Sequence, residues 1–278
     1  MIKRMLDGIP VRLKAPHDLG WLSAFGRVFC VFDHLISGNL CFGVENPAGR
    51  LFIKYAGAQT INCAGDPGAA VMALRGAAER YDLLSHPNLS QKLDAFETEN
   101  GFGLVFPWFP GFALAPVPLY LRQLRGLPLL HRLRIYDGLA AFIVNASDCD
   151  YVAAGVADEH ILFDALSQRV IFSSVDRYLL MPAKTPYAKM PGSPFYVAPE
   201  GYSPGETLDE TTNVYTMGAL AFTFFGDRST FAQAGWEAPM PLFFEAKNAV
   251  HDKKEKRHQS AAGFLTAWRE AVLRLPLS

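Results

Sequence analysis

Hydrophobic residues in the first hundred positions occur in short runs separated by turn-forming residues. The runs at residues 28–32, 39–45 and 51–55 are rich in β-branched and aromatic side chains. Two more runs of this kind lie at residues 93–98 and 103–108. Short strands joined by tight turns pair with their neighbours in the chain. The pattern therefore predicts an antiparallel sheet in this part of the protein.

A single helix is predicted after the third run. Asp66 and Pro67 are typical of a helix start, because an aspartate side chain can accept a hydrogen bond from the first turn and proline fits the first helical position. The apolar residues that follow recur every three or four positions, which predicts one buried face: Val71, Leu74, Ala77, Tyr81 and Leu84. Residues 85–88 are expected to end the helix.

The second half of the chain has mostly helical spacing. Residues 213–225 are apolar on nearly every side, which predicts a buried central helix too short to cross a bilayer. Ser260 can cap a last helix. One face of that helix is apolar: Phe264, Trp268 and Val272. An earlier helix is indicated by a further apolar stripe: Leu130, Leu133, Tyr136, Ala140 and Ile143.

Two further segments are not predicted to be helical. Residues 161–163 and 170–172 predict a short β-hairpin. Residues 101–121 carry no charge, but four prolines would break a helix that crosses a membrane. We predict a buried strand there, followed by a connection stiffened by proline.

Composition indicates a folded protein and excludes several classes. Of 278 residues, 50% are hydrophobic and 19% are charged, which suits a large core and not a disordered chain. With 26 basic and 27 acidic residues the net charge is −1, so no basic field is available to hold nucleic acid. The four cysteines lack metal-ligand spacing, and residues 1–14 do not form a secretory signal. We expect a cytoplasmic protein with free thiols and no membrane partner.

Five features follow one another along the chain in a specific order. They are F-I-K at residues 52–54, L-L-S-H-P-N-L at 83–89, Y-V-A-P-E at 196–200, N-V-Y-T-M-G at 213–218, and Arg257 before the last helix. Each alone is a weak signal, but five in this order resemble the protein kinase fold, from about residue 28 to residue 271. The resemblance implies that Lys54 pairs with phosphate. It also implies that Arg257 pairs with Glu200.

The sequence is most similar to a group of small bacterial serine/threonine-kinase-like proteins. Sequence motifs of these proteins resemble residues 37–44, 52–58, 151–159 and 212–219 of this chain. The resemblance implies an α+β, bilobal protein-kinase-like fold. We expect an N-terminal lobe over residues 1–108, with an antiparallel sheet and one helix, and a mostly helical C-terminal lobe over residues 109–278.

Phosphoryl transfer depends on positioning and on neutralisation of charge. Lys54 is present, but Ala77 stands where kinases have the helix glutamate that holds this lysine. Glu79 is two residues away on the helix and is expected to face elsewhere. The turn that would cover the phosphates keeps only Gly38, where kinases have three glycines. An ordinary hairpin turn is therefore favoured.

The resemblance also assigns the residues around an adenine ring. Phe52 takes the place of a small alanine above the ring, and a phenyl group there could fill the pocket. Leu162 would form the floor, and Phe106 begins the hinge segment at residues 106–109. Binding of ATP and of magnesium is therefore left open.

The catalytic loop departs most from the kinase pattern. Aligned on the strand at residues 161–163, Gly155 replaces the catalytic aspartate and His160 replaces the metal-binding asparagine. A neutral imidazole suits magnesium poorly. Ser174 replaces the aspartate that holds magnesium, and Asp176 keeps a carboxylate nearby.

These substitutions favour a pseudokinase that does not transfer phosphate and acts by binding a protein partner or a ligand. An alternative is an atypical serine/threonine kinase in which Lys54 holds phosphates, Asp176 holds the metal and Asp158 orients the acceptor. Asp158 is more typical of a turn-forming aspartate. A small-molecule phosphotransferase of the aminoglycoside or choline kinase type is a third reading, weakened because the H-x-D-x-x-x-x-N loop is missing.

Overall fold

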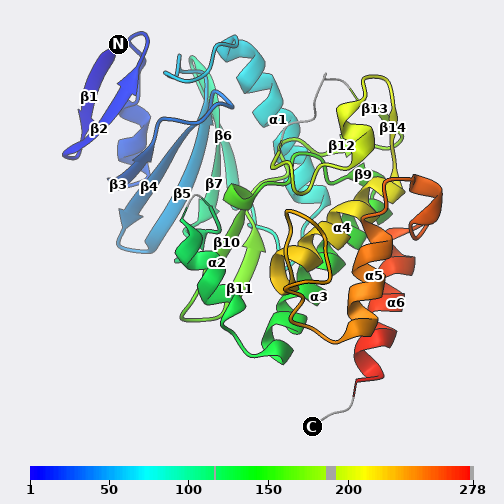
Figure 1. The fold of residues 1–278 in the computed structure, drawn as a ribbon. Coiled ribbons are helices and arrows are strands. Elements are labelled where there is room, and N and C mark those ends of the chain that lie inside the picture. The colour runs from blue at the N-terminus through cyan, green and yellow to red at the C-terminus, as the bar shows by residue number, and fades with distance from the viewer. Residues whose placement is uncertain (116, 186–191, 276–278) are drawn as a thin grey trace. The chain divides into compact units, whose positions relative to one another are not determined.

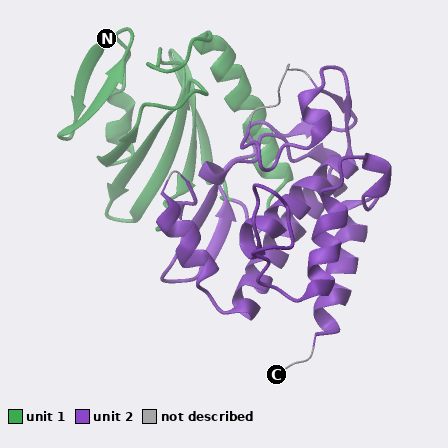
Figure 2. Cartoon of the chain, in the orientation of Figure 1, with its two compact units in different colours: residues 1–85, 90–110 green, residues 86–89, 111–278 purple. Residues whose placement is uncertain are grey.

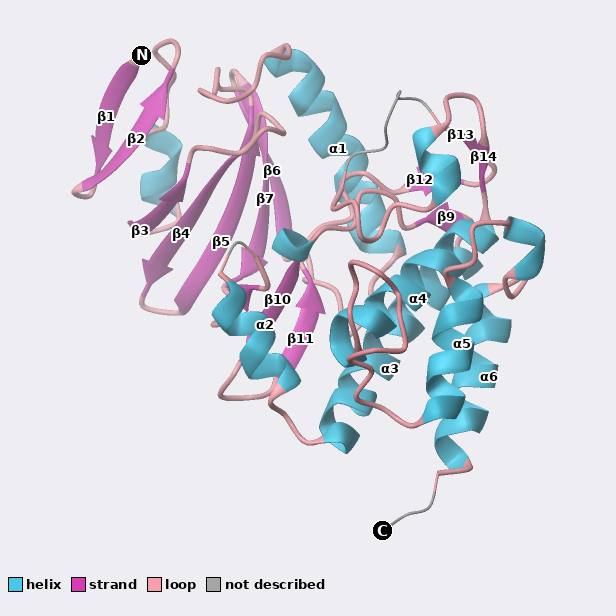
Figure 3. Cartoon of the chain, viewed as in Figure 1, coloured by secondary structure: helices cyan, strands magenta, loops and turns pink. Residues whose placement is uncertain are grey.

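The computed structural model describes residues 1–115, 117–185 and 192–275 of the chain. The chain divides into two compact units (Figure 2): unit 1 contains residues 1–85 and 90–110, and unit 2 contains residues 86–89 and 111–278. Strands dominate unit 1 and helices dominate unit 2 (Figure 3).

Unit 1 is built around an antiparallel sheet, as the run pattern predicts. Its strands lie in the order β3-β4-β5-β7-β6, while β1 and β2 form a separate hairpin (Figure 1). The elements are β1 (Ile2–Leu6), β2 (Ile9–Leu13), a 3₁₀ helix (Gly20–Ala24), β3 (Arg27–Phe32), β4 (Leu40–Asn46), β5 (Gly49–Ala56), α1 (Pro67–Leu83), β6 (Asp94–Thr98) and β7 (Gly101–Pro107).

The two faces of this sheet are covered differently. Alternate residues of a strand point to opposite faces. Residues such as Phe42 and Ile53 form one apolar core with Val11 of β2 and Leu22 of the 3₁₀ helix. Lys54 lies on the opposite face, where it meets α1. The N-terminal hairpin therefore completes the core on one side, and α1 covers part of the other.

Helix α1 begins as predicted. The Asp66 carboxylate accepts a hydrogen bond from the Ala69 amide at 3.0 Å, and Pro67 is the first helical residue. The buried face includes Leu74, Ala77 and Tyr81, and the following residue Leu84 is also buried. Glu79 is exposed, as its spacing predicts.

Unit 2 is built around the apolar helix α4. Its elements are β8 (Phe112–Ala113), α2 (Pro118–Arg125), α3 (Leu129–Asp148), β9 (Tyr151–Val152), β10 (Ile161–Asp164), β11 (Arg169–Phe172), β12 (Leu179–Leu180), β13 (Ala183–Lys184), β14 (Thr207–Leu208), α4 (Glu210–Phe225), α5 (Met240–Ala249) and α6 (Ala261–Leu273).

Helix α4 is buried along nearly its whole length, as predicted. The Tyr136 hydroxyl of α3 donates to the Met217 carbonyl at 2.9 Å. A Cβ atom on Gly218 would lie 2.6 Å from Cβ of Ala249, so this glycine lets α4 and α5 approach closely. The Ser260 side chain caps α6, where Phe264 and Trp268 are buried.

Three features of the fold differ from the sequence expectations. The predicted proline-rich connection contains a helix, α2, which begins at Pro118. Proline is suited to that position because its missing amide hydrogen would be unpaired there anyway. Leu130, the first member of the predicted α3 stripe, is exposed. No prediction covered the β1–β2 hairpin or α5.

The segment after α1 belongs to unit 2, whereas the sequence placed residues 1–108 in one lobe. The Phe172 amide donates to the Asn88 carbonyl at 2.7 Å, and the Asn88 side chain donates to the Val170 carbonyl at 3.1 Å. Leu89 forms a parallel bridge with Phe172. These bonds attach residues 86–89 to β11. The main boundary lies after residue 110, two residues beyond the predicted one.

A buried ion pair connects the segment before α4, the start of α4 and the segment before α6. Two nitrogen atoms of Arg257 donate to the two carboxylate oxygens of Glu200, at 2.8 and 3.0 Å, as the sequence predicts. Both residues are buried. Arg257 also donates to the Thr211 and His251 carbonyls, and the Thr212 hydroxyl donates to Glu200. The pair therefore fixes the start of α4 against the segments before and after it.

No helix in the described ranges is long and apolar enough to span a bilayer.

We expect Arg257→Ala to lower the free energy of unfolding by about 3–5 kcal/mol, because Glu200 would stay buried without its cation. Urea unfolding followed by circular dichroism measures this change. A matched control is Arg274→Ala, which removes an exposed pair with Glu270 in the same unit and should cost only about 0.3–0.5 kcal/mol. Equal losses in the two variants would contradict a structural role for the buried pair.

The same pair predicts a pH dependence. Burial by itself would raise the pKa of Glu200, but the hydrogen bond and charge of Arg257 outweigh burial, and the pKa is lowered from its ordinary value of 4.5. A carboxyl whose pKa is lower in the folded state stabilises fully above its unfolded pKa, and this stabilisation is lost as pH falls through the folded pKa. We expect stability to fall more steeply below about pH 4.5 in the wild type than in Glu200→Gln. Parallel stability curves would refute this.

Candidate functional site

The residues assigned by the kinase resemblance lie in both units, and each unit holds its own part. Unit 1 carries Lys54, Phe52, Phe106 and Gly38. Unit 2 carries the loop before β10 and the segment after β11, with the remaining candidates: Gly155, Asp158, His160, Leu162, Ser174 and Asp176.

Lys54 is buried against α1. Its ammonium donates a hydrogen bond to the hydroxyl of Tyr81 at 3.2 Å. The ammonium also lies 5.5 Å from the ring centre of Tyr81 and 6.0 Å from that of Phe106. Ala77, one turn before Tyr81, is fully buried. In this unit a tyrosine hydroxyl therefore contacts the lysine one turn beyond the position where kinases have a glutamate.

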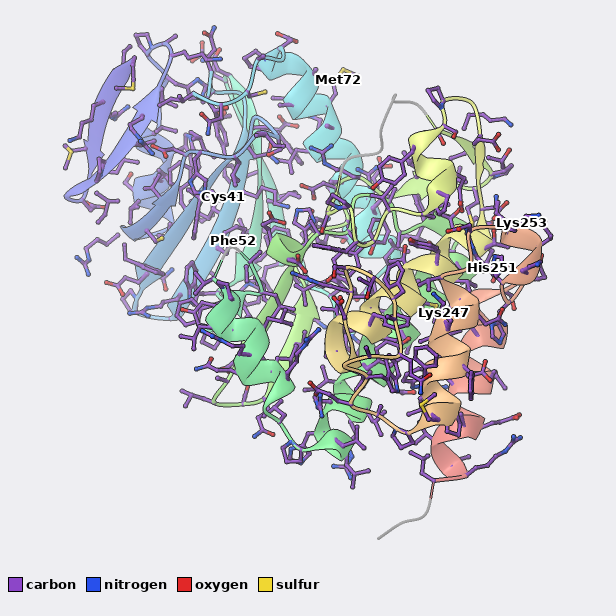
Figure 4. The ribbon with its side chains drawn as sticks, viewed as in Figure 1. Cys41, Phe52, Met72, Lys247, His251 and Lys253 are labelled. Carbon is purple, nitrogen blue, oxygen red and sulfur yellow. The ribbon has the colours of Figure 1, made fainter. Side chains whose placement is uncertain are left out.

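Aromatic rings cover the sheet beside Lys54. Phe52 pairs with Gly43 on one side and with Phe106 on the other. Because Gly43 has no side chain, the rings of Phe29 and Trp108 lie over it, and a Cβ there would be 2.7 and 2.8 Å from them. Figure 4 marks Phe52 on β5 and Cys41 on the neighbouring strand β4.

The Phe52 ring is part of this cluster and is half-buried. Its centre lies 6.2 to 6.4 Å from the ring centres of Phe32, Phe106 and Trp108. The face of the sheet that the sequence assigned to an adenine ring is therefore lined by large rings. Leu162, the assigned floor, lies in unit 2 on β10, where it pairs with Ile171 and Ala113.

Gly38 lies in the turn between β3 and β4 with φ of +84°, a conformation that favours glycine. A Cβ there would be 3.1 Å from Cβ of Ala70 and 3.2 Å from Sγ of Cys63. The turn therefore packs on the start of α1 through its glycine. Before this turn, the Asp33 carboxylate accepts hydrogen bonds from the Arg12 side chain and amide, and the side-chain bond lowers the pKa of Asp33.

In unit 2 the loop at residues 151–160 is anchored by Asn213 of α4. The side-chain oxygen Oδ1 of Asn213 accepts a hydrogen bond from the Ala153 amide at 2.7 Å. Its amide group donates to the Tyr151 carbonyl and to the Ser147 hydroxyl. Asn213 is fully buried. The loop backbone just before Gly155 is therefore fixed by the central helix.

Gly155, which replaces the catalytic aspartate in the sequence alignment, has φ of +74°. A Cβ there would lie 2.8 Å from both Cβ and Cδ of Arg177. The stem of Arg177 thus occupies the room that a side chain at position 155 would need. Gly192 packs on the same backbone, and its own Cβ would be 3.1 Å from Cα of Gly155.

Asp158 is buried in a polar cluster. It forms an ion pair with Arg228, and the Tyr196 hydroxyl donates to its carboxylate at 2.7 Å. The Tyr196 oxygen also lies 3.0 Å from the Thr223 hydroxyl of α4, and Arg228 stacks on the Phe195 ring at 4.5 Å. Burial, followed by the charge of Asp158, raises the pKa of Tyr196. Asp158 thus anchors residues 195–196.

His160 and the serines after β11 lie together on the predicted hairpin. Because Ile161 pairs with Phe172, the residue that faces His160 is Ser173, whose amide donates to the His160 carbonyl at 2.8 Å. Ser174, which the sequence assigned to the metal position, comes one residue later. Its hydroxyl accepts from the Asp176 amide at 3.4 Å. The His160 ring contacts the Gly155 carbonyl at 3.2 Å.

No group of three or more histidine, cysteine, aspartate or glutamate side chains in the described ranges is arranged to hold a metal ion.

Three residues of these environments were missed by the sequence reasoning. Tyr81 was assigned to the core, although its position one turn after Ala77 was visible in the helical stripe. Arg228 and Arg177 carried no local signal, because each meets its partner residue through the tertiary fold. For Arg177 the kinase resemblance offered an indirect signal: a glycine at the predicted aspartate position leaves room that another side chain can fill.

Comparison with known proteins supports the fold. No protein-family model matches the chain, and no curated protein matches its sequence. The chain is similar in structure to the kinase domain of PknI from Mycobacterium tuberculosis, solved as a double mutant, with a TM-score of 0.57 and 16% identity. The match covers 89% of this chain and 96% of that domain. The protein thus has a protein-kinase-like fold of the α+β class.

We expect Gly155→Asp to destabilise the protein more than a positive φ angle alone would. Strain at such an angle costs about 1–3 kcal/mol for a residue with a side chain. Gly205→Asp is a matched control, because Gly205 has φ of +83° and nothing within 4 Å of its Cβ position. Arg177→Ala should partly rescue Gly155→Asp by making room. Equal melting temperatures for the two glycine variants would contradict the steric argument.

Proposed function

We propose that this protein is a pseudokinase, a kinase-like protein that does not transfer phosphate and acts by binding a protein partner. The observation that carries this proposal is the filled space at Gly155. A general base must lie within hydrogen-bond reach of the proton that it accepts. At this position the chain offers a glycine and the stem of Arg177 instead of a carboxylate.

The state of Asp158 supports the same proposal. It is the acidic residue of the loop that could have replaced the missing base. Its carboxylate is buried and is occupied by Arg228 and Tyr196. Withdrawing it would leave Arg228 without its anion and Tyr196 without its acceptor, which is costly for buried groups. A structural role is therefore favoured for Asp158.

The aromatic face of unit 1 supports a reduced role for nucleotide. Phe52 places a large ring where the kinase resemblance assigns a small alanine above adenine, and the rings of Phe29 and Trp108 lie beside it over Gly43. These rings would have to move for a planar base to bind against β4 and β5. Binding of a partner, rather than turnover of ATP, is consistent with such a surface.

The proposal predicts that purified protein with Mg-ATP transfers no phosphate to itself or to generic protein substrates. Radiolabelled ATP measures this directly. Lys54→Met is the matched control, because any contaminating kinase would give equal signal in both samples. Transfer that disappears in Lys54→Met would overturn the proposal. If Asp176→Asn also removed the signal, the protein would be an atypical serine/threonine kinase.

Thermal melting of the protein with ATP, with and without magnesium, is a second test of the proposal. A ligand at 100 times its dissociation constant adds about 2.7 kcal/mol to stability, which raises the melting temperature by about 5 °C or more. We expect no shift that requires magnesium. A magnesium-dependent shift would count against the proposal, since it would mean that a metal-nucleotide complex binds.

A further inference from the structure

Arg177 is held beside Gly155 in a defined position. Its Cβ and Cδ atoms line the space that a side chain at Gly155 would take. The guanidinium group is attached directly to Cδ, so its positive charge is also held at this loop. The residue is half-buried. A long side chain loses rotamer freedom when it is held this way, which costs free energy unless contacts compensate.

The guanidinium of Arg177 differs from the other buried or half-buried arginines of unit 2. Arg257 is paired with Glu200, Arg228 with Asp158 and Arg132 with Glu237. For Arg177 the described parts of the chain supply neither a hydrogen-bond acceptor nor an ion-pair partner. Within the described ranges, its five N–H donors are therefore available for further hydrogen bonds.

The buried carboxylate of this loop is already engaged by another arginine. Asp158 is the buried carboxylate of the same loop, but Arg228 neutralises it. The His160 ring contacts the Gly155 carbonyl. Gly155 and Gly192 pack on each other and add no side chains that could shield the guanidinium.

We propose that Arg177 binds an oxyanion, a carboxylate or a phosphate, carried by a peptide segment of a protein partner. A planar guanidinium matches either group through two parallel hydrogen bonds. A carboxylate at position 155 would repel such an anion, whereas the glycine with Arg177 beside it reverses the sign of the charge at this point. This inference rests on the proposed function, because it names the chemistry that the partner supplies.

Fluorescence polarisation with three degenerate peptide libraries tests the proposal. The libraries share the same random flanking positions and differ in a central serine, glutamate or phosphoserine. We expect the glutamate or the phosphoserine library to bind more tightly than the serine library, and the tighter of the two identifies the anion. Binding should weaken with added salt.

Variants then assign this preference to Arg177. Arg177→Gln keeps most of the stem beside Gly155 and should lower affinity for the anionic library roughly ten- to hundredfold, as expected for charge-assisted hydrogen bonds. Arg177→Lys should retain part of the affinity. Arg134→Gln removes an exposed arginine of α3 in the same unit and should change nothing.

Two results would overturn the inference: equal binding of all three libraries by the wild type, or anion preference that persists in Arg177→Gln. The first needs no variant, so the test stands even if Arg177→Gln fails to fold. The phosphotransfer assay separates this inference from the proposed function. An inactive wild type without anion preference refutes the oxyanion site alone, whereas transfer that depends on Lys54 refutes the proposed function.

Discussion

The polar groups of the buried helix α4 hold the loop at residues 151–160 and the segment at residues 195–196 in place. Asn213 holds the backbone of the loop through Ala153 and Tyr151. Farther along the helix, Thr223 contacts the Tyr196 hydroxyl, which in turn donates to Asp158. A buried polar group without a partner is costly, so breaking any of these bonds would destabilise the loop or residues 195–196. One rigid helix therefore fixes both the loop around Gly155 and residues 195–196.

The same constraint limits the room in this loop. With the backbone held by Asn213, the room at Gly155 is small and fixed, and the stem of Arg177 takes it. Asp158 lies in the same loop but is engaged by Arg228. A catalytic carboxylate, as the kinase resemblance implies it, would need the space at position 155 and would have to be free of an ion pair such as that of Asp158 with Arg228. The loop thus has a kinase-like backbone, but its charged groups are placed differently from those that the kinase resemblance implies.

Most of the fold was accessible from local pattern. The strands of the main sheet, the cap at Asp66 and the apolar helix α4 follow from periodicity and turn chemistry, which act over a few residues. Helix α2 was missed because Pro118 was weighed as a breaker and not as a first helical residue. Residues 86–89 group with unit 2, although the sequence placed them in the first lobe, because their partner, β11, lies more than eighty residues away in the chain. No local signal marks such a bond.

The sequence by itself determined the kinase-like order of elements and the Glu200–Arg257 pair, because each depends on motif order and residue identity. The position of Gly155 in place of an aspartate is what the kinase resemblance implies. Only the tertiary structure decided what surrounds those residues. The contact of Tyr81 with Lys54, the rings over Gly43 and the stem of Arg177 beside Gly155 all join residues distant in the chain. Their positions depend on how the elements pack, and side-chain packing in a dense interior is set by the whole fold.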